Sequence, residues 1–90
     1  MDEIGYQKFL VAIFKETYDE IVSDLRKAER EKRRAETAPT TDMASQNKRT
    51  YQLKMIHVKY LEDWIRDVMP AYLDIDPDKF IAWAHEEAKR

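Results

Sequence analysis

The first 38 residues contain no proline and a single glycine, and their apolar residues recur every three or four positions. That spacing places them along one face of a helix. The stripe consists of Val11, Phe14, Tyr18, Ile21, Leu25 and Ala28, and it is widened toward the N-terminus by Phe9, Leu10, Ile13 and Val22. Beyond Arg26 charged helix formers dominate, so a helix is predicted over 3–36 whose second half is a solvated rod.

Pro39 makes the clearest break in the chain, because proline is excluded from helix interiors and disfavours a helical Ala38. A linker is predicted over 37–42 and a second helix over 43–69, with Thr40, Thr41 or Asp42 as its N-cap. A strand around Leu53 is the competing interpretation, but the alternation fails at Ile56 and no second strand is available. The seam of this helix is Tyr51, Val58, Leu61, Ile65 and Val68, with Met55 and Trp64 alongside.

A third, short helix is predicted over 77–89, after a turn over 70–76. Pro70 ends or kinks the second helix at Met69. Asp76 is an N-cap followed by Pro77 at the first helical position, and Ile75 and Phe80 stand at the positions of a hydrophobic staple. The predicted fold is a single all-α domain, a long antiparallel helical hairpin plus a short third C-terminal helix packed against its open end.

Charge is segregated along the chain. Residues 1–25 hold two bases and six acids, residues 26–59 ten bases and four acids, and residues 60–90 four bases and eight acids. A hairpin therefore has a basic tip and an acidic open end. Oppositely charged pairs at helical spacing, such as Glu29 with Arg33, explain much of this segregation, because such pairs keep the second half of the first helix solvated. The candidate residues of a binding surface at the basic tip are Lys32, Arg33, Arg34, Lys48 and Arg49.

Motifs for catalysis, cofactors or metals are absent from the sequence. Without cysteine there is no thiol nucleophile or Cys-based zinc site, and no glycine-rich loop can hold phosphate. His85-Glu86-Glu87 lacks the second histidine of a zinc-protease helix. A carboxylate metal site from Glu16 and Glu20 with Glu62 or Asp63 is conceivable, but the Glu-x-x-His pairs of di-metal bundles are missing. We expect no catalytic, cofactor-binding or metal-ligating residues.

Three observations bear on the compartment. The lack of cysteine fits an intracellular protein, and we expect a soluble, cytoplasmic one. No apolar stretch approaches the 18 residues of a membrane span, so no membrane partner is expected. Acidic residues after Met1 are unlike a secretory leader.

The leading hypothesis is a small non-enzymatic interaction protein of the regulator, adaptor or inhibitor type, such as phages and mobile elements encode. It would bind a protein partner and form a homodimer through the first helix, where Tyr18 and Ile21 lie. Large side chains with an acidic rim predict the partner-binding surface. Its proposed residues are Trp64, Asp67, Tyr72, Asp74 and Trp83.

Two alternatives remain. One is a nucleic-acid-associated protein that uses the basic tip, with Tyr51 available to stack on bases. The other is a small all-α enzyme, because the size and order of the helices are similar in outline to dimeric helical chorismate mutases. Those enzymes hold a dicarboxylate with bases inside the bundle, whereas here the bases cluster at the tip.

Overall fold

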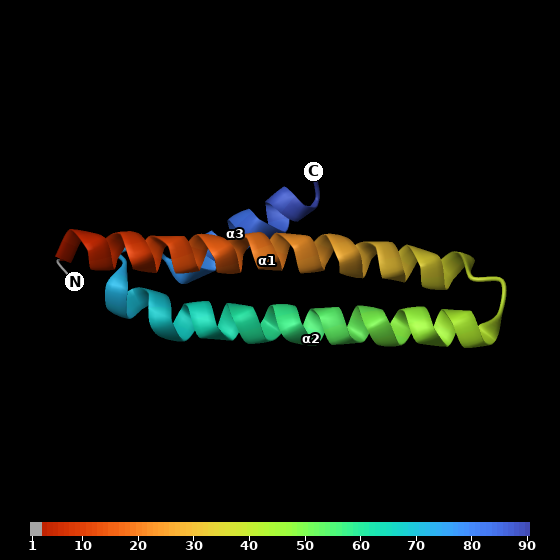
Figure 1. The fold of residues 1–90 in the computed structure, drawn as a ribbon. Coiled ribbons are helices and arrows are strands. Elements are labelled where there is room, and N and C mark those ends of the chain that lie inside the picture. Colours follow the sequence, from red (N-terminus) through yellow and green to blue (C-terminus); the bar gives the residue numbers. More distant parts are fainter. Residues whose placement is uncertain (1–2) are drawn as a thin grey trace.

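A computed structural model describes residues 3–90, and Figure 1 shows three helices with a short turn between the first two. Helix α1 spans Glu3–Thr37, α2 spans Thr41–Tyr72 and α3 spans Pro77–Ala88, and no strand occurs among the described residues. Helices α1 and α2 run antiparallel along their lengths. The predicted all-α hairpin with a short C-terminal helix is confirmed.

The turn at the tip is fixed by Thr40. Its backbone is extended, and its side-chain oxygen accepts a hydrogen bond of 3.2 Å from the backbone N–H of Met43. Asp42 follows in the first turn, where its charge favours the positive end of the helix. Of the three N-caps that the sequence allowed, the structure uses Thr40.

The buried seam of α1 differs from the predicted stripe. Phe14, Ile21 and Ala28 are buried as expected, but Thr17 and Asp24 are buried between them, which completes a regular three-four spacing. Tyr18 and Leu25 are only partly buried, and Val11 is 52% exposed. Two polar side chains are tolerated in the seam because both have partners. The Thr17 hydroxyl donates to the Ile13 carbonyl oxygen, and the partners of Asp24 are described below.

Helix α2 continues three residues past its predicted end at Met69. Pro70 lies inside its last turn, where a proline removes only one backbone hydrogen bond. The Leu73 backbone N–H then donates to the Met69 carbonyl oxygen at 2.8 Å and closes the helix. The buried residues of α2 are Val58, Leu61, Ile65 and Met69.

Helix α3 begins as the sequence predicts, with Asp76 capping the backbone N–H of Asp78 at 3.0 Å and Pro77 in the first turn. It crosses α1 obliquely and ends beside the middle of α1 (Figure 1). Ile81 and Ala84 are buried in the core that α1 and α2 share. Three polar contacts also hold α3 in place: Arg26 to the Glu87 carbonyl oxygen, His85 to Glu62, and Arg66 to Asp78.

The molecule is elongated, with principal extents of 57 × 23 × 18 Å and a radius of gyration of 16.2 Å. A compact chain of this length has a radius of gyration of about 12 Å. Much of both long helices therefore faces solvent. Among the described residues, no helix combines the length and hydropathy needed to cross a bilayer.

Candidate functional site

A groove of about 490 Å³ lies where α1, the end of α2 and α3 meet. Met69 and Leu73 contribute from the end of α2, and Ile75 from the connection to α3. Most of the lining side chains are apolar, and the polar side chains are interspersed among them. The full lining is Val11, Phe14, Lys15, Tyr18, Asp19, Met69, Leu73, Ile75, Phe80 and Glu87.

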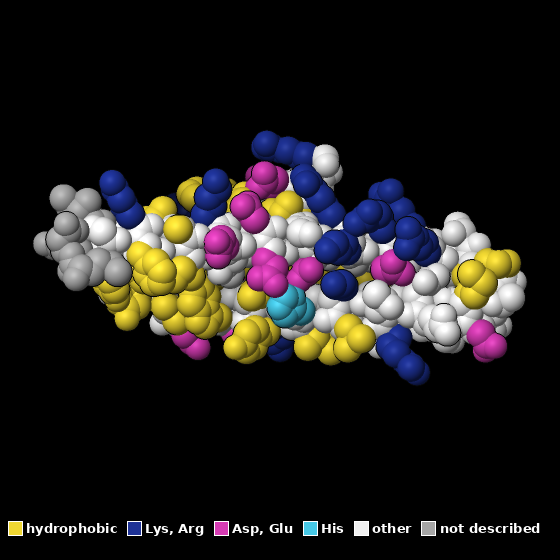
Figure 2. All heavy atoms as spheres, in the orientation of Figure 1, with side chains coloured by type: hydrophobic (Ala, Val, Ile, Leu, Met, Phe, Trp, Pro, Cys, Tyr) yellow, Lys and Arg dark blue, Asp and Glu magenta, His cyan; other side chains and the backbone are white. Residues whose placement is uncertain are grey.

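The groove belongs to the acidic end of the molecule. Residues 3–25 and 60–90, which each hold more acids than bases, are folded together there. Asp74 and Asp76 flank Ile75 in the connection that borders the groove, and Asp78 follows in the first turn of α3. Figure 2 shows hydrophobic side chains gathered over this end, while Lys and Arg gather over α1 nearer the tip. The site is thus an apolar groove in an acidic surface.

The pKa of Tyr18 is raised to about 12, because its hydroxyl hydrogen-bonds to Glu87 and burial disfavours the phenolate. Tyr18 also packs against Phe80, with ring centroids 5.2 Å apart. These two contacts tie α1 to α3 across the groove. They join residues of α1 and α3 that both line the groove.

The aromatic residues predicted as a partner surface lie in three different places. Trp64 packs against Phe14 at 5.4 Å, within the hairpin. Tyr72 is exposed and meets Tyr6 edge-on at 6.2 Å. Trp83 is exposed on α3 and lines a small hollow with Tyr18 and neighbouring charged side chains. Asp67 and Asp74 are exposed. The groove was not predicted, although its members Phe80 and Ile75 were singled out as a staple.

Two residues of the first helix that were predicted to form a dimer surface are covered to different extents within the single chain. Ile21 is fully buried inside the hairpin, and Tyr18 is covered by Phe80. Val11 of the same stripe is 52% exposed and lines the groove. The homodimer through the first helix stays a prediction.

At the basic tip, Lys32 and Lys48 line a hollow of about 300 Å³ together with Tyr51. Glu36 lines it as well. Arg33 and Arg34 instead pair with Glu29 at 3.4 Å and Glu31 at 2.9 Å on their own helix. Arg49 is exposed on α2. The structure brings two of the five predicted bases to one hollow with an aromatic ring.

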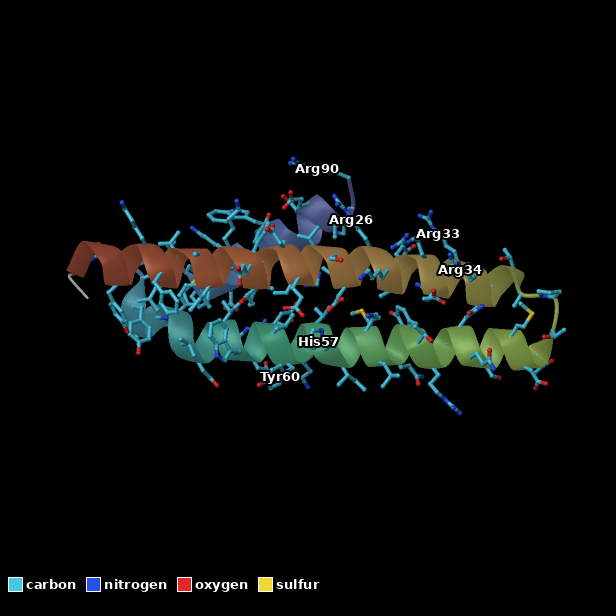
Figure 3. All side chains as sticks on the ribbon, viewed as in Figure 1. Arg26, Arg33, Arg34, His57, Tyr60 and Arg90 are labelled. Atoms are coloured by element: carbon cyan, nitrogen blue, oxygen red, sulfur yellow. The ribbon has the colours of Figure 1, made fainter. Side chains whose placement is uncertain are left out.

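A second basic area arises from tertiary structure. The end of α3 places Lys89 and Arg90 beside Arg26, Arg30 and Arg33 of α1, around a hollow of about 450 Å³. Figure 3 shows Arg26, Arg33 and Arg90 on the same side of α1. Sequence position assigns the last residues to the acidic segment, so only the fold reveals this cluster.

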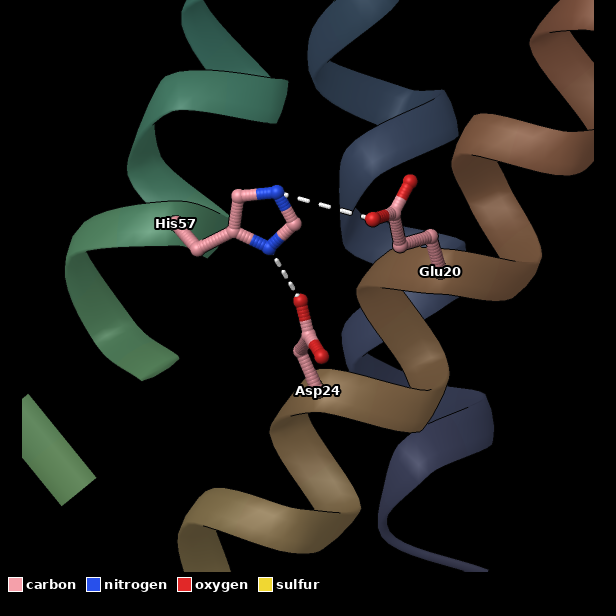
Figure 4. Close-up of side chains that lie close together, drawn as sticks. All are labelled: Glu20, Asp24 and His57. Atoms are coloured by element: carbon pink, nitrogen blue, oxygen red, sulfur yellow. Dashed lines mark hydrogen bonds and ion pairs between the residues drawn. The ribbon is translucent and has the colours of Figure 1, made fainter. Parts of the chain in front are cut away.

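A cluster of charged residues spans the middle of the hairpin (Figure 4). The Nδ1 of His57 lies 2.5 Å from Oδ2 of buried Asp24, and its Nε2 lies 3.5 Å from Oε1 of Glu20. Lys54 Nζ approaches the other Asp24 oxygen at 3.8 Å. Asp24 could have been anticipated, because it follows Ile21 by three residues and precedes Ala28 by four on the buried face.

The ligand atoms of Glu20, Asp24 and His57 lie within 4.8 Å of one another, close enough to consider a metal ion. The two carboxylates, however, contact different nitrogens of the ring, Asp24 at Nδ1 and Glu20 at Nε2. The 2.5 Å between Nδ1 and Oδ2 is also less than the ~3.3 Å between two ligands of a tetrahedral zinc ion. The geometry fits a hydrogen-bonded bridge between α1 and α2.

Acid–base catalysis fits the same cluster poorly. A carboxylate on Nδ1 orients the ring as in catalytic Asp–His pairs, but Glu20 faces the nitrogen that would have to meet a substrate or nucleophile. The cluster instead satisfies a buried carboxylate. Comparison of the chain with protein families, with curated proteins and with solved structures finds no match.

Proposed function

We propose that this chain is a non-enzymatic interaction protein whose acidic groove binds a basic, amphipathic segment of a partner protein. The observation that carries the proposal is the groove itself, which is lined mostly by apolar side chains and borders a cluster of aspartates. Regulators, adaptors and inhibitors act through such surfaces. The expected compartment is the cytoplasm, in line with the cysteine-free composition.

The shape of the groove supports a helical ligand. Its lining comes from α1, the end of α2 and α3, and the Tyr18 contacts with Phe80 and Glu87 join α1 to α3. An amphipathic helix binds such a groove by inserting apolar residues spaced three and four apart. The apolar lining supplies the burial that holds the ligand, at about 25 cal/mol per Å² of apolar area removed from water.

The charge of the surroundings supports a basic ligand. The described parts of the two segments that form this end each hold more acids than bases, so the field favours the approach of positive side chains. Rim charges of this kind raise the association rate and select among partners. Lysine or arginine residues beside the apolar face of a ligand would meet Asp19, Asp74 and Asp76.

The test uses a synthetic helical peptide of leucine and lysine, with the leucines at helical spacing, and a matched peptide with glutamate in place of lysine. Fluorescence anisotropy measures binding to the full chain. The lysine peptide should bind, and the glutamate peptide should not. Ile75→Glu and Val11→Glu should each weaken binding about tenfold or more, because both side chains line the groove while remaining 41% and 52% exposed.

Met43→Glu is the matched control, since Met43 is 48% exposed at the tip, far from the groove. It should leave peptide binding unchanged. Circular dichroism would verify that each variant keeps its helices. Equal binding of both peptides, or equal loss in the control, would show that the groove does not recognise a basic amphipathic segment.

Association with nucleic acid is the second candidate function. It is supported by the hollow at the tip, where Lys32 and Lys48 flank Tyr51, since basic grooves with a stacking ring bind single strands. Glu36 in the same hollow opposes phosphate. Lys15 likewise lines the acidic groove, but that groove is the larger of the two, at about 490 Å³ against 300 Å³, and it holds Asp19 and Glu87 as well. We therefore rank nucleic acid second.

The two candidates are separated by salt and by charge reversal at the tip. Binding to a single-stranded oligonucleotide should fall steeply with salt, because phosphate contacts release counterions. Reversing Arg33, Arg34 and Lys48 to Glu should abolish oligonucleotide binding without altering peptide binding. Oligonucleotide binding that resists salt and survives the reversal would exclude the tip as its site.

A further inference from the structure

Helix α2 carries a second apolar stripe on the face turned away from α1. Leu53, Ile56 and Tyr60 follow one another at spacings of three and four, and they are 61%, 64% and 67% exposed. Figure 3 shows Tyr60 pointing away from α1 and His57 pointing toward it. The buried seam of α2 lies on the opposite side of the helix, so this outer stripe has no partner within the described part of the chain.

The outer stripe ends in opposite charges. At the same helical spacing, Arg49 precedes Leu53 by four residues and Asp63 follows Tyr60 by three. Both are exposed. Along this face the order is therefore base, apolar residues, acid, a pattern that complements itself when a second copy runs in the opposite direction.

We infer that a second copy of this chain packs antiparallel on the outer stripe, so that two hairpins form a symmetric dimer through α2. A two-fold axis between positions 56 and 57 sets Leu53 against Tyr60 of the second copy and brings the two Ile56 side chains together. The same axis places Arg49 one position from the level of Asp63 of the second copy. Each contact occurs twice, as an isologous interface requires.

The distribution of charge over the whole chain favours the same direction. An antiparallel pair places the basic tip of one hairpin, with its excess of six bases, beside the acidic open end of the other. A parallel pair would place tip against tip and acid against acid. Opposite potentials across an interface fix orientation and exclude the alternative arrangement.

The chain exposes 6778 Å², whereas an average monomer of this mass exposes about 5,500 Å². The surplus reflects the elongated shape, which leaves the outer face of α2 open to a second copy. Asp63 already lies 3.4 Å from Arg66, but this ion pair is solvent-exposed and long. Asp63 can therefore still form an ion pair with Arg49 of the second copy.

Sedimentation velocity over a micromolar dilution series tests the inference. The native chain should approach twice its mass of 10.8 kDa. Ile56→Glu should remain monomeric and helical, because the side chain is outside the core. Met43→Glu, which is equally polar but off the stripe, should still dimerise. Ile75→Glu should dimerise too, so a failure of the groove proposal would leave this result standing.

Charge reversal tests the direction of packing. Arg49→Asp and Asp63→Arg should each weaken the dimer about tenfold, because like charges then face each other. The variant with both changes keeps opposite charges in register and should recover within about threefold of the native chain. A double variant as weak as either single one would refute the antiparallel pairing.

Cysteine cross-linking gives an independent measure, because the native chain has no cysteine. Mild oxidation should join copies that carry Ile56→Cys and leave copies with Arg49→Cys unjoined, since the two Arg49 positions lie about 22 Å apart along the antiparallel helices. Cross-linking at both positions would indicate a parallel dimer. Absence of any dimer by sedimentation and cross-linking would overturn the inference altogether.

Discussion

At the scale of single residues, Asp24 has the environment least suited to its chemistry. Its carboxylate is only 5% exposed in a seam of apolar side chains, and burial of an unpaired charge is costly. His57 and Lys54 of α2 compensate for it. The cluster thereby fixes which residues of the two long helices face each other, because any shift along the helices would separate Asp24 from both partners.

Removing His57 should destabilise the fold. His57→Leu leaves Asp24 buried with Lys54 alone, and we expect a loss of about 1–3 kcal/mol in the free energy of unfolding. Asp24→Leu together with His57→Leu should cost less than His57→Leu alone, because the buried charge is then absent. Urea unfolding followed by circular dichroism measures all three chains. A double variant less stable than the single one would contradict this role for the cluster.

Tyr18 gives a prediction at alkaline pH. Its pKa is about 12 in the folded chain against an ordinary 10.0, so the fold favours the neutral phenol. The stability that this contributes is complete below pH 10 and is lost as the pH rises toward 12. Ultraviolet titration of the tyrosines should show a late step that Tyr18→Phe removes and that Glu87→Gln shifts to lower pH. If Glu87→Gln leaves the late step at the same pH, the raised pKa of Tyr18 has a cause other than Glu87.

At the scale of elements, neighbouring residues in the sequence decide where each helix ends. They do not decide which of its residues are buried against the other helices. The cap at Asp76 and the break at Pro39 were predictable because each depends on neighbours in sequence. The end of α2 was predicted at Met69, although the helix runs to Tyr72. Pro70 disrupts only one hydrogen bond, and so close to the helix end the loss is tolerated. Which apolar residues of α1 are buried depends on α2 and α3, so the sequence stripe misplaced Val11.

The two capping residues should have separable effects. Asp76→Ala should weaken α3 by about 1 kcal/mol, and Thr40→Ala should weaken the start of α2 by a similar amount. Amide hydrogen exchange should then show faster exchange in α3 for the first variant and only at the tip for the second. Faster exchange throughout the hairpin in either variant would mean that the caps support the whole fold rather than one helix end.

The candidate site was less predictable than the helices. Ile75 and Phe80 were recognised as neighbours of a turn, but the groove also needs Val11 and Tyr18, which are more than fifty residues away in sequence. Lys89 and Arg90 likewise join Arg26 only because α3 folds back along α1. Periodicity identifies which face of a helix is apolar. It does not identify which part of that face another helix leaves uncovered.

At the scale of the whole molecule, the elongated hairpin separates two kinds of surface. The open end combines acidic charge with the apolar groove, and the tip combines basic charge with a small hollow beside Tyr51. A chain of 90 residues has a small core, and here two long helices leave large apolar side chains on the surface. Exposed apolar patches of this kind mark interaction sites.

Binding of a basic amphipathic segment in the acidic groove can be followed through the amide chemical shifts of the full chain during titration with the leucine–lysine peptide. We expect saturable shifts at Val11, Tyr18 and Ile75, with the amides of Met43 and Lys48 unchanged at the tip. Shifts confined to the tip, or spread evenly over the acidic surface without saturation, would contradict it.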